Sequence, residues 1–144
     1  MKNVVVTGGS GRLGPWVIKD LIAHGYDVTN VDTRQPADSV ARTIVANLEN
    51  LGEAYHVLLG ADAVIHMAAI PVPFSNPNDV VFRNNVMSTF NLMEAAANLG
   101  IKKLYSVQVK HRMEYVMHPY SPSICRLMRI TRSCLKTAMV YLKS

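Results

Sequence analysis

The feature that most constrains the fold is a short apolar run followed by a glycine-rich turn. Residues 3–7 (Asn-Val-Val-Val-Thr) are mostly β-branched and uncharged, as in strands buried at the centre of a parallel sheet. The turn after them consists of Gly8, Gly9, Ser10, Gly11, Arg12, Leu13 and Gly14. Glycines at this spacing permit a tight turn, close approach of a pyrophosphate, and packing of the next helix on the strand. The spacing predicts a dinucleotide-binding turn, with the N-terminal amides of the helix directed at the phosphates.

The segment after the turn has the periodicity of a helix. Apolar residues recur at helical spacing from about residue 12, at Val17, Ile18, Leu21 and Ile22. Pro15 lies in the predicted first turn, where its missing N–H costs little, and Gly25 is placed to end the helix. Strand, glycine turn and helix therefore follow one another in the order that a dinucleotide site requires.

A carboxylate occupies the position expected of a ribose-binding group. A second predicted strand, residues 26–31, ends in Asp32, eighteen positions after Gly14. An acidic residue there accepts hydrogen bonds from the adenosine ribose hydroxyls and repels a 2′-phosphate. We therefore favour NAD as the cofactor. Arg34 leaves NADP open, because its guanidinium could accommodate the additional phosphate.

The rest of the first 109 residues alternates between strands and helices. Apolar runs predict further strands at residues 42–46, 62–66 and 102–107. Helical spacing predicts helices at 51–59 and from a capped start at Asn76-Pro77-Asn78-Asp79 to Gly100. The pattern predicts an α/β fold, a doubly wound parallel sheet (Rossmann) of about five strands in the order 3-2-1-4-5.

Several motifs together resemble one enzyme family. The turn, Asp32 and residues 64–69 (Val-Ile-His-Met-Ala-Ala) are similar to the extended short-chain dehydrogenase/reductases, the NAD-dependent epimerase/dehydratase group. The resemblance runs from residue 1 to about residue 108. It implies that Asn47 and Leu48, where the family has Asp-Leu or a similar pair, contact the adenine. It also identifies His66 as a structural strand residue and not as the proton shuttle.

The same resemblance assigns residues beneath the cofactor. Ala68 and Ala69 would form a floor, because small residues at the strand end let the chain pass close under the dinucleotide. Residues 85–96 are similar to the family's Asn-Val-x-Gly-Thr-x-Asn-Leu helix, in which the first Asn, here Asn85, supports the active site from below. The alternative for Asn85 is a polar residue on a packed helix.

The catalytic pair of the family is missing from this sequence. The family uses Tyr-x-x-x-Lys, in which the Tyr is the general acid/base and the Lys, one helical turn away, lowers the pKa of the Tyr. No Tyr in the chain is followed by Lys at that spacing, so we assign no catalytic residue. The two cysteines, Cys125 and Cys134, have no metal-binding spacing, and we expect no metal site.

The charge divides the chain in two. Residues 1–109 contain 8 Lys/Arg and 9 Asp/Glu, whereas residues 110–144, the basic tail, contain 7 Lys/Arg and one acidic residue. A basic arm can bind nucleic acid, and Arg126, Arg129 and Arg132 could share a helical face. The apolar residues of the tail form no matching stripe. The tail is therefore of doubtful structure. An alternative to a functional basic arm is that this segment of the gene is translated out of frame.

Back-translation makes the out-of-frame interpretation specific. With suitable third bases, the codons of residues 125–144, read from the last base of the Ile124 codon, spell Met-Pro-Ile-Asp-Glu-Asp-His-Pro-Val-Leu-Pro-Glu-Asp-Ser-Tyr-Gly-Leu-Ser-Lys-Lys. This string resembles the missing family segment and contains Tyr-x-x-x-Lys. Because the first two bases of most codons are fixed by the amino acid, twenty shifted triplets without a stop are informative. We hypothesise a frameshifted, prematurely ended product whose frame changes near residues 105–112.

These observations predict the NAD(P)-binding portion of a nucleotide-sugar epimerase/dehydratase-like oxidoreductase, truncated and without turnover. The alternative is a dinucleotide-sensing module whose basic tail contacts nucleic acid or a partner protein, and we favour it less. Without a membrane span or a signal peptide, a cytoplasmic location is expected. Self-association is also open, because the sheet edge at residues 104–107 and nearby helix faces lack a cover.

Overall fold

The computed structural model describes residues 2–72 and 74–107 of the 144-residue chain. These residues form one parallel sheet in the order β3-β2-β1-β4-β5, as the sequence predicts. The strands are β1 (Asn3–Thr7), β2 (Asp27–Asp32), β3 (Arg42–Val45), β4 (Ala63–His66) and β5 (Lys103–Ser106). The basic tail, with Cys125 and Cys134, lies outside the described residues, as do residues 108–112 of the range 105–112 in which we expect the frame to change.

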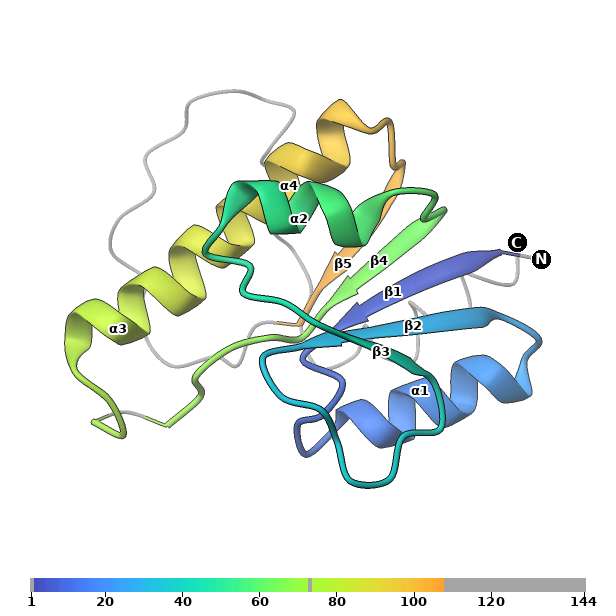
Figure 1. Cartoon of the computed structure of the whole chain (residues 1–144), viewed down its shortest axis with the longest axis horizontal. Helices are drawn as coiled ribbons and strands as arrows, with labels where there is room; N and C mark the ends of the chain where they lie inside the picture. The colour runs from blue at the N-terminus through green and yellow to red at the C-terminus, as the bar shows by residue number, and fades with distance from the viewer. Residues whose placement is uncertain (1, 73, 108–144) are drawn as a thin grey trace.

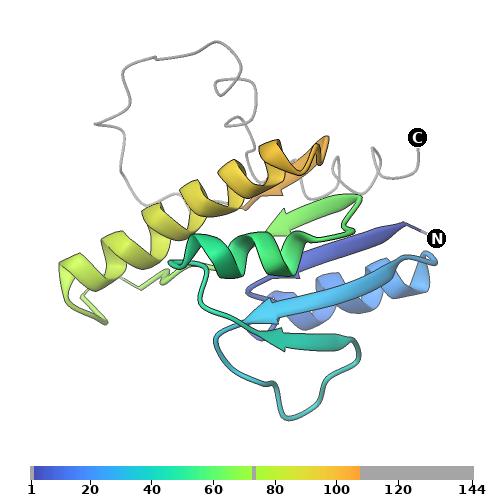
Figure 2. The ribbon, with the colours of Figure 1, turned by 45° about the horizontal axis from the view of Figure 1, so that its top comes forward.

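Helices cover both faces of the sheet (Figures 1 and 2). The helix α1 (Gly14–Ala23) packs on one face. On the opposite face lie α2 (Leu51–Leu58) and α4 (Ser88–Asn98), which contact each other. A short helix, α3 (Asn78–Phe82), leads into α4 through a π-helical segment, η1 (Arg83–Met87). The chain thus winds to one side of β1 and then to the other, as in a doubly wound sheet.

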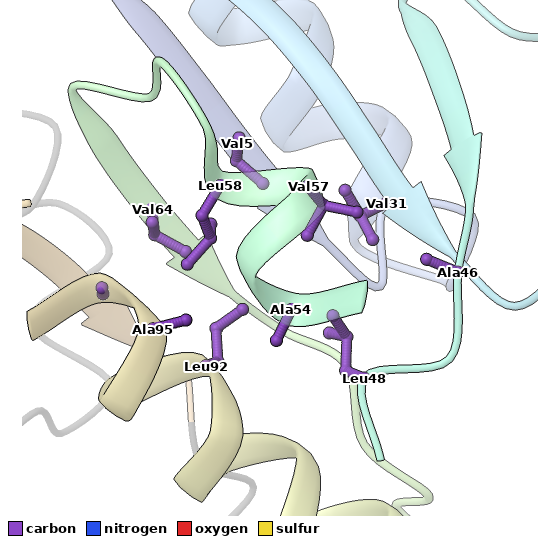
Figure 3. Close-up of a cluster of buried hydrophobic side chains, with 11 residues drawn as sticks. Val5, Val31, Ala46, Leu48, Ala54, Val57, Leu58, Val64, Leu92 and Ala95 are labelled. Atoms are coloured by element: carbon purple, nitrogen blue, oxygen red, sulfur yellow. The ribbon is translucent and has the colours of Figure 1, made fainter. Parts of the chain in front are cut away.

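Alternating side chains of the central strands build two apolar cores. Val4 and Val6 of β1 face α1, whereas Val5 between them faces α2 and α4. Figure 3 shows the second core, in which Leu58 and Leu92 converge on the valines of the sheet. Because β1 is apolar on both faces, it can lie only inside the sheet, and this position fixes where its carboxyl end emerges.

The long helix predicted after residue 76 differs from the prediction in two ways. It begins at Asn78, after an extended Pro77, and no side chain caps it. Asn76 is therefore not the expected cap; its side-chain Nδ2 donates to the Ser75 hydroxyl (3.2 Å). The helix also widens at η1, where an extra residue per turn interrupts the regular spacing; such π-helical turns occur often at functional sites.

Candidate functional site

The predicted site residues gather at the carboxyl edge of the sheet. Parallel strands all end at this edge, so the segments after β1, β2, β3 and β4 are neighbours there. β1 continues into α1 on one face, and β4 continues toward helices on the other face. Doubly wound sheets bind their ligands where the connections diverge in this way.

Three glycines of the turn are required by the packing of the protein itself. Gly8 has φ +73°, and a Cβ there would lie 2.6 Å from the Ala68 nitrogen. A Cβ at Gly9 would lie 2.2 Å from Asn30 Oδ1, and one at Gly14 would lie 2.1 Å from the Gly9 carbonyl oxygen. Real Cβ atoms do not approach other atoms so closely. Gly8 and Gly14 meet backbone atoms, so strand, turn and helix can pack together only without side chains there, whereas a Cβ at Gly9 would have to displace the Asn30 and Ile18 side chains.

Gly11 is different, because it is exposed and its packing does not demand glycine. The nearest atom to a Cβ there is the Gly8 carbonyl oxygen at 3.1 Å, a tight contact without overlap that requires this backbone atom to shift slightly. Arg12 and Leu13 beside it are also exposed, and no side chain caps the N-terminus of α1. The open side of the turn therefore combines a residue without a side chain with a helix end whose amides attract anions.

Asp32 connects the end of β2 to the glycine turn. Its carboxylate accepts hydrogen bonds from the Ser10 amide (3.0 Å) and the Thr33 amide (2.8 Å). The Ser10 hydroxyl donates to the Arg34 carbonyl (3.2 Å) and accepts from the Asn30 side chain (3.2 Å). The Arg34 side chain is exposed. The predicted ribose-binding carboxylate and the predicted phosphate-binding turn are thus directly bonded to each other.

The predicted adenine segment lies beside Asp32. The Ala46 amide donates to the Asp32 carbonyl (3.0 Å), which places Asn47 next in line at the sheet edge. Asn47 is exposed, and its carboxamide oxygen accepts from the Glu49 amide (3.0 Å), which leaves its NH2 group as the donor for a ligand. The Leu48 side chain, in contrast, is buried in the core that Figure 3 shows.

Residues after β4 form the opposite side of the site. Ala68, half-buried, packs against Gly8, and Ala69 is exposed. Asn85 of η1 binds both backbone polar groups of Ile70: its Oδ1 accepts from the Ile70 amide (2.8 Å) and its Nδ2 donates to the Ile70 carbonyl (3.1 Å). Asn85 therefore fixes the path of the chain just beyond the two alanines.

A polar network around His66 was not foreseen from the sequence. Nδ1 of His66 lies 2.7 Å from Thr7 Oγ1, and Nε2 lies 2.9 Å from Thr89 Oγ1. Since the Thr89 hydroxyl donates to the Asn85 carbonyl (2.6 Å), it accepts from His66, which assigns the proton to Nε2. Burial lowers the pKa of His66 to about 4, so the ring is neutral at pH 7.

The network could not be inferred from sequence spacing. Thr7 and His66 are register partners in β1 and β4, 59 positions apart, and Thr89 comes from a third element. The sequence offered one signal for it, because Thr7 and His66 are polar residues at the ends of the apolar runs that form β1 and β4. Within residues 2–72 and 74–107, no cluster of side chains could hold a metal ion, and no helix is long and apolar enough to cross a membrane.

Comparison with known proteins agrees with this geometry. The family model for the NAD-dependent epimerase/dehydratase family matches residues 4–109. This chain belongs to that family. Human sterol-4-alpha-carboxylate 3-dehydrogenase, decarboxylating, is 35% identical over 104 residues, which are 72% of this chain and 28% of the human protein. The chain thus spans less than a third of that relative.

Solved structures show the same fold with ligands in place. A short-chain dehydrogenase/reductase superfamily protein from Agrobacterium tumefaciens with bound NAD matches with a TM-score of 0.66 and 29% identity, over 72% of this chain and 31% of that protein. MoeE5, solved in complex with UDP-glucuronic acid and NAD, matches with a TM-score of 0.66 and 31% identity, over 72% of this chain and 36% of MoeE5. The family members that this chain resembles therefore include NAD-binding proteins.

Proposed function

We propose that residues 1–109 bind NAD as the dinucleotide-binding portion of an epimerase/dehydratase-type oxidoreductase. Gly8 to Gly14, with Arg12 and Leu13 at the rim, would receive the pyrophosphate, and Asp32 would receive the adenosine ribose. Asn47 and the backbone of Leu48 would border the adenine, with Ala68, Ala69 and Asn85 beneath the rest of the cofactor. When bound, NAD would supply a hydride acceptor.

One observation carries the proposal. Packing explains the glycines at 8, 9 and 14, but it does not explain Gly11, which is exposed on the open side of the turn. A ligand that approaches the backbone closely accounts for a glycine at that position. The uncapped N-terminus of α1 adjoins it, and Asp32 lies at hydrogen-bonding distance from the turn. The combination fits a diphosphate joined to a sugar.

The proposed substrate class, for an enzyme with the complete catalytic machinery, is a nucleotide sugar such as the one held by MoeE5. The competing substrate class is a sterol carboxylate, the substrate that appears in the name of the human relative. We propose that the present chain has no turnover, because its sequence contains no Tyr followed by Lys four positions later. The general base and the group that tunes its pKa are both missing.

Titration of the full chain with NADH, followed by fluorescence, tests the proposal. We expect NADH to bind more tightly than NADPH, because the Asp32 carboxylate would repel a 2′-phosphate. Asp32→Asn removes that charge but retains an acceptor, so we expect the preference for NADH to fall about tenfold. Asp38→Ala, an exposed carboxylate on the following loop, is the matched control. A wild-type chain that binds neither dinucleotide contradicts the proposal.

A further inference from the structure

Asn91 of α4 makes a buried contact that the proposed site does not yet include. The side chain is 4% exposed, and its Nδ2 donates to the carbonyls of both Leu48 (3.0 Å) and Glu49 (2.8 Å). These partners lie 43 and 42 positions away in the sequence. A single amide group therefore holds two consecutive carbonyls of the segment that follows β3.

The segment held in this way carries the predicted adenine contact. Asn47 immediately precedes the two carbonyls, and its own amide donates to Glu53 Oε2 (2.7 Å). Because Asn47 Oδ1 accepts from the Glu49 amide, the NH2 group is the part of this side chain that is left to donate to a ligand. The Leu48 side chain belongs to the same apolar core as Leu92 of α4 (Figure 3), and its burial also holds the segment in place.

We propose that Asn91 is a positioning residue that sets base selectivity at the adenine end of the site; this inference rests on the proposed function. By holding the carbonyls of residues 48 and 49, Asn91 fixes the turn that points the Asn47 NH2 group at the ring. That group is a donor, so it suits adenine, whose N1 accepts a hydrogen bond. We place this donor opposite N1 of the ring, where hypoxanthine carries a hydrogen instead of an acceptor. A wild-type chain that binds the hypoxanthine dinucleotide as tightly, through its O6 acceptor, contradicts the inference.

The discriminating measurement is the ratio of affinities for NADH and for the reduced nicotinamide hypoxanthine dinucleotide, determined by fluorescence titration of the full chain. We expect the wild-type chain to prefer NADH about tenfold, the effect of one well-formed hydrogen bond against a mismatched one. In Asn91→Leu, which keeps the approximate shape but removes both donated bonds, we expect the ratio to fall to about one. General damage to the fold would weaken both ligands and leave the ratio unchanged.

Asn98→Leu is the matched control, because Asn98 lies on the same helix but is exposed and, among the residues that the structure describes, donates to Tyr55 and Glu94 and not to the segment after β3. It should keep the wild-type ratio. If Asn91→Leu does not fold, Asn91→Ala replaces it. Asn47→Ala, at an exposed position, must also abolish the preference.

The outcomes separate the two proposals. A wild-type chain that binds NADH, with an unchanged ratio in Asn91→Leu or Asn91→Ala, overturns this inference and leaves the proposed function standing. An unchanged ratio in Asn47→Ala does the same, because Asn91 would then have no base contact to position. A wild-type chain that binds neither dinucleotide overturns the proposed function, and the inference with it.

Discussion

At the scale of single residues, two glycines of the same turn should respond differently to alanine. We expect Gly11→Ala to lower the free energy of unfolding by less than about 1 kcal/mol, because its Cβ has one tight contact and otherwise open space. NADH affinity should nevertheless fall about tenfold or more, because the methyl group would occupy the proposed phosphate position. Gly14→Ala should instead prevent stable folding, since its Cβ would overlap the Gly9 carbonyl. Urea denaturation and NADH titration of both variants separate the two effects.

His66 should make the stability of the protein depend on pH. Its pKa is about 4 in the folded chain against 6.5 for an unburied histidine, so the unfolded chain binds a proton more readily. Stability is therefore fully present above pH 6.5 and decreases as the pH falls toward 4, by about 3 kcal/mol in total. The free energy of unfolding, measured across this pH range, should change less steeply with pH in His66→Gln than in the wild-type chain. Equal slopes in the two proteins would contradict the assignment.

At the scale of elements, α4 should stabilise the carboxyl ends of β1 and β4, because its Thr89 bonds His66, which in turn contacts Thr7. Thr89→Val keeps the shape of the side chain but removes the acceptor for His66 Nε2. The buried N–H then lacks its partner, and we expect a loss of about 1–3 kcal/mol of unfolding free energy. Thr43→Val, in β3, provides a comparison outside this network, although it removes the acceptor of a bond from Asn30. A variant as stable as the wild type would show that the network does not tie the elements together.

The same elements show what sequence patterns can and cannot predict. The apolar run of residues 3–7 and the glycine spacing are local, so the position of β1 and the close packing of Gly8 and Gly14 followed from them. The contacts of His66 with Thr89 and of Asn91 with Leu48 were not predictable, because each joins elements whose relative placement depends on sheet register. The π-helical turn also gave no local signal, because the apolar spacing tolerates one additional residue.

At the scale of the whole molecule, residues 1–109 should be the unit that binds the dinucleotide. The family match ends at residue 109, and the excess of positive charge begins after it. We expect a chain ending at residue 109 to retain the NADH affinity of the full chain within about twofold, because every proposed binding residue precedes that position. A large loss of affinity would instead assign the basic tail a part in the site. A salt-sensitive affinity for nucleic acid that disappears with the tail would support the alternative function.

The reading-frame hypothesis yields the last prediction, and it concerns the gene. The tail combines a charge unlike that of the first 109 residues with codons that can spell the family's Tyr-x-x-x-Lys segment one base out of register. Third bases were free in that back-translation, whereas in the gene they are fixed. We therefore expect the coding DNA of residues 125–144 to encode, from the last base of the Ile124 codon, an uninterrupted string with Tyr followed by Lys four positions later. Restoring the frame should then add the missing general base, the Tyr hydroxyl, to a chain that already binds NAD. NAD-dependent turnover should then appear. A shifted frame with a stop codon, or without the pair, would show that the tail is encoded as it is read.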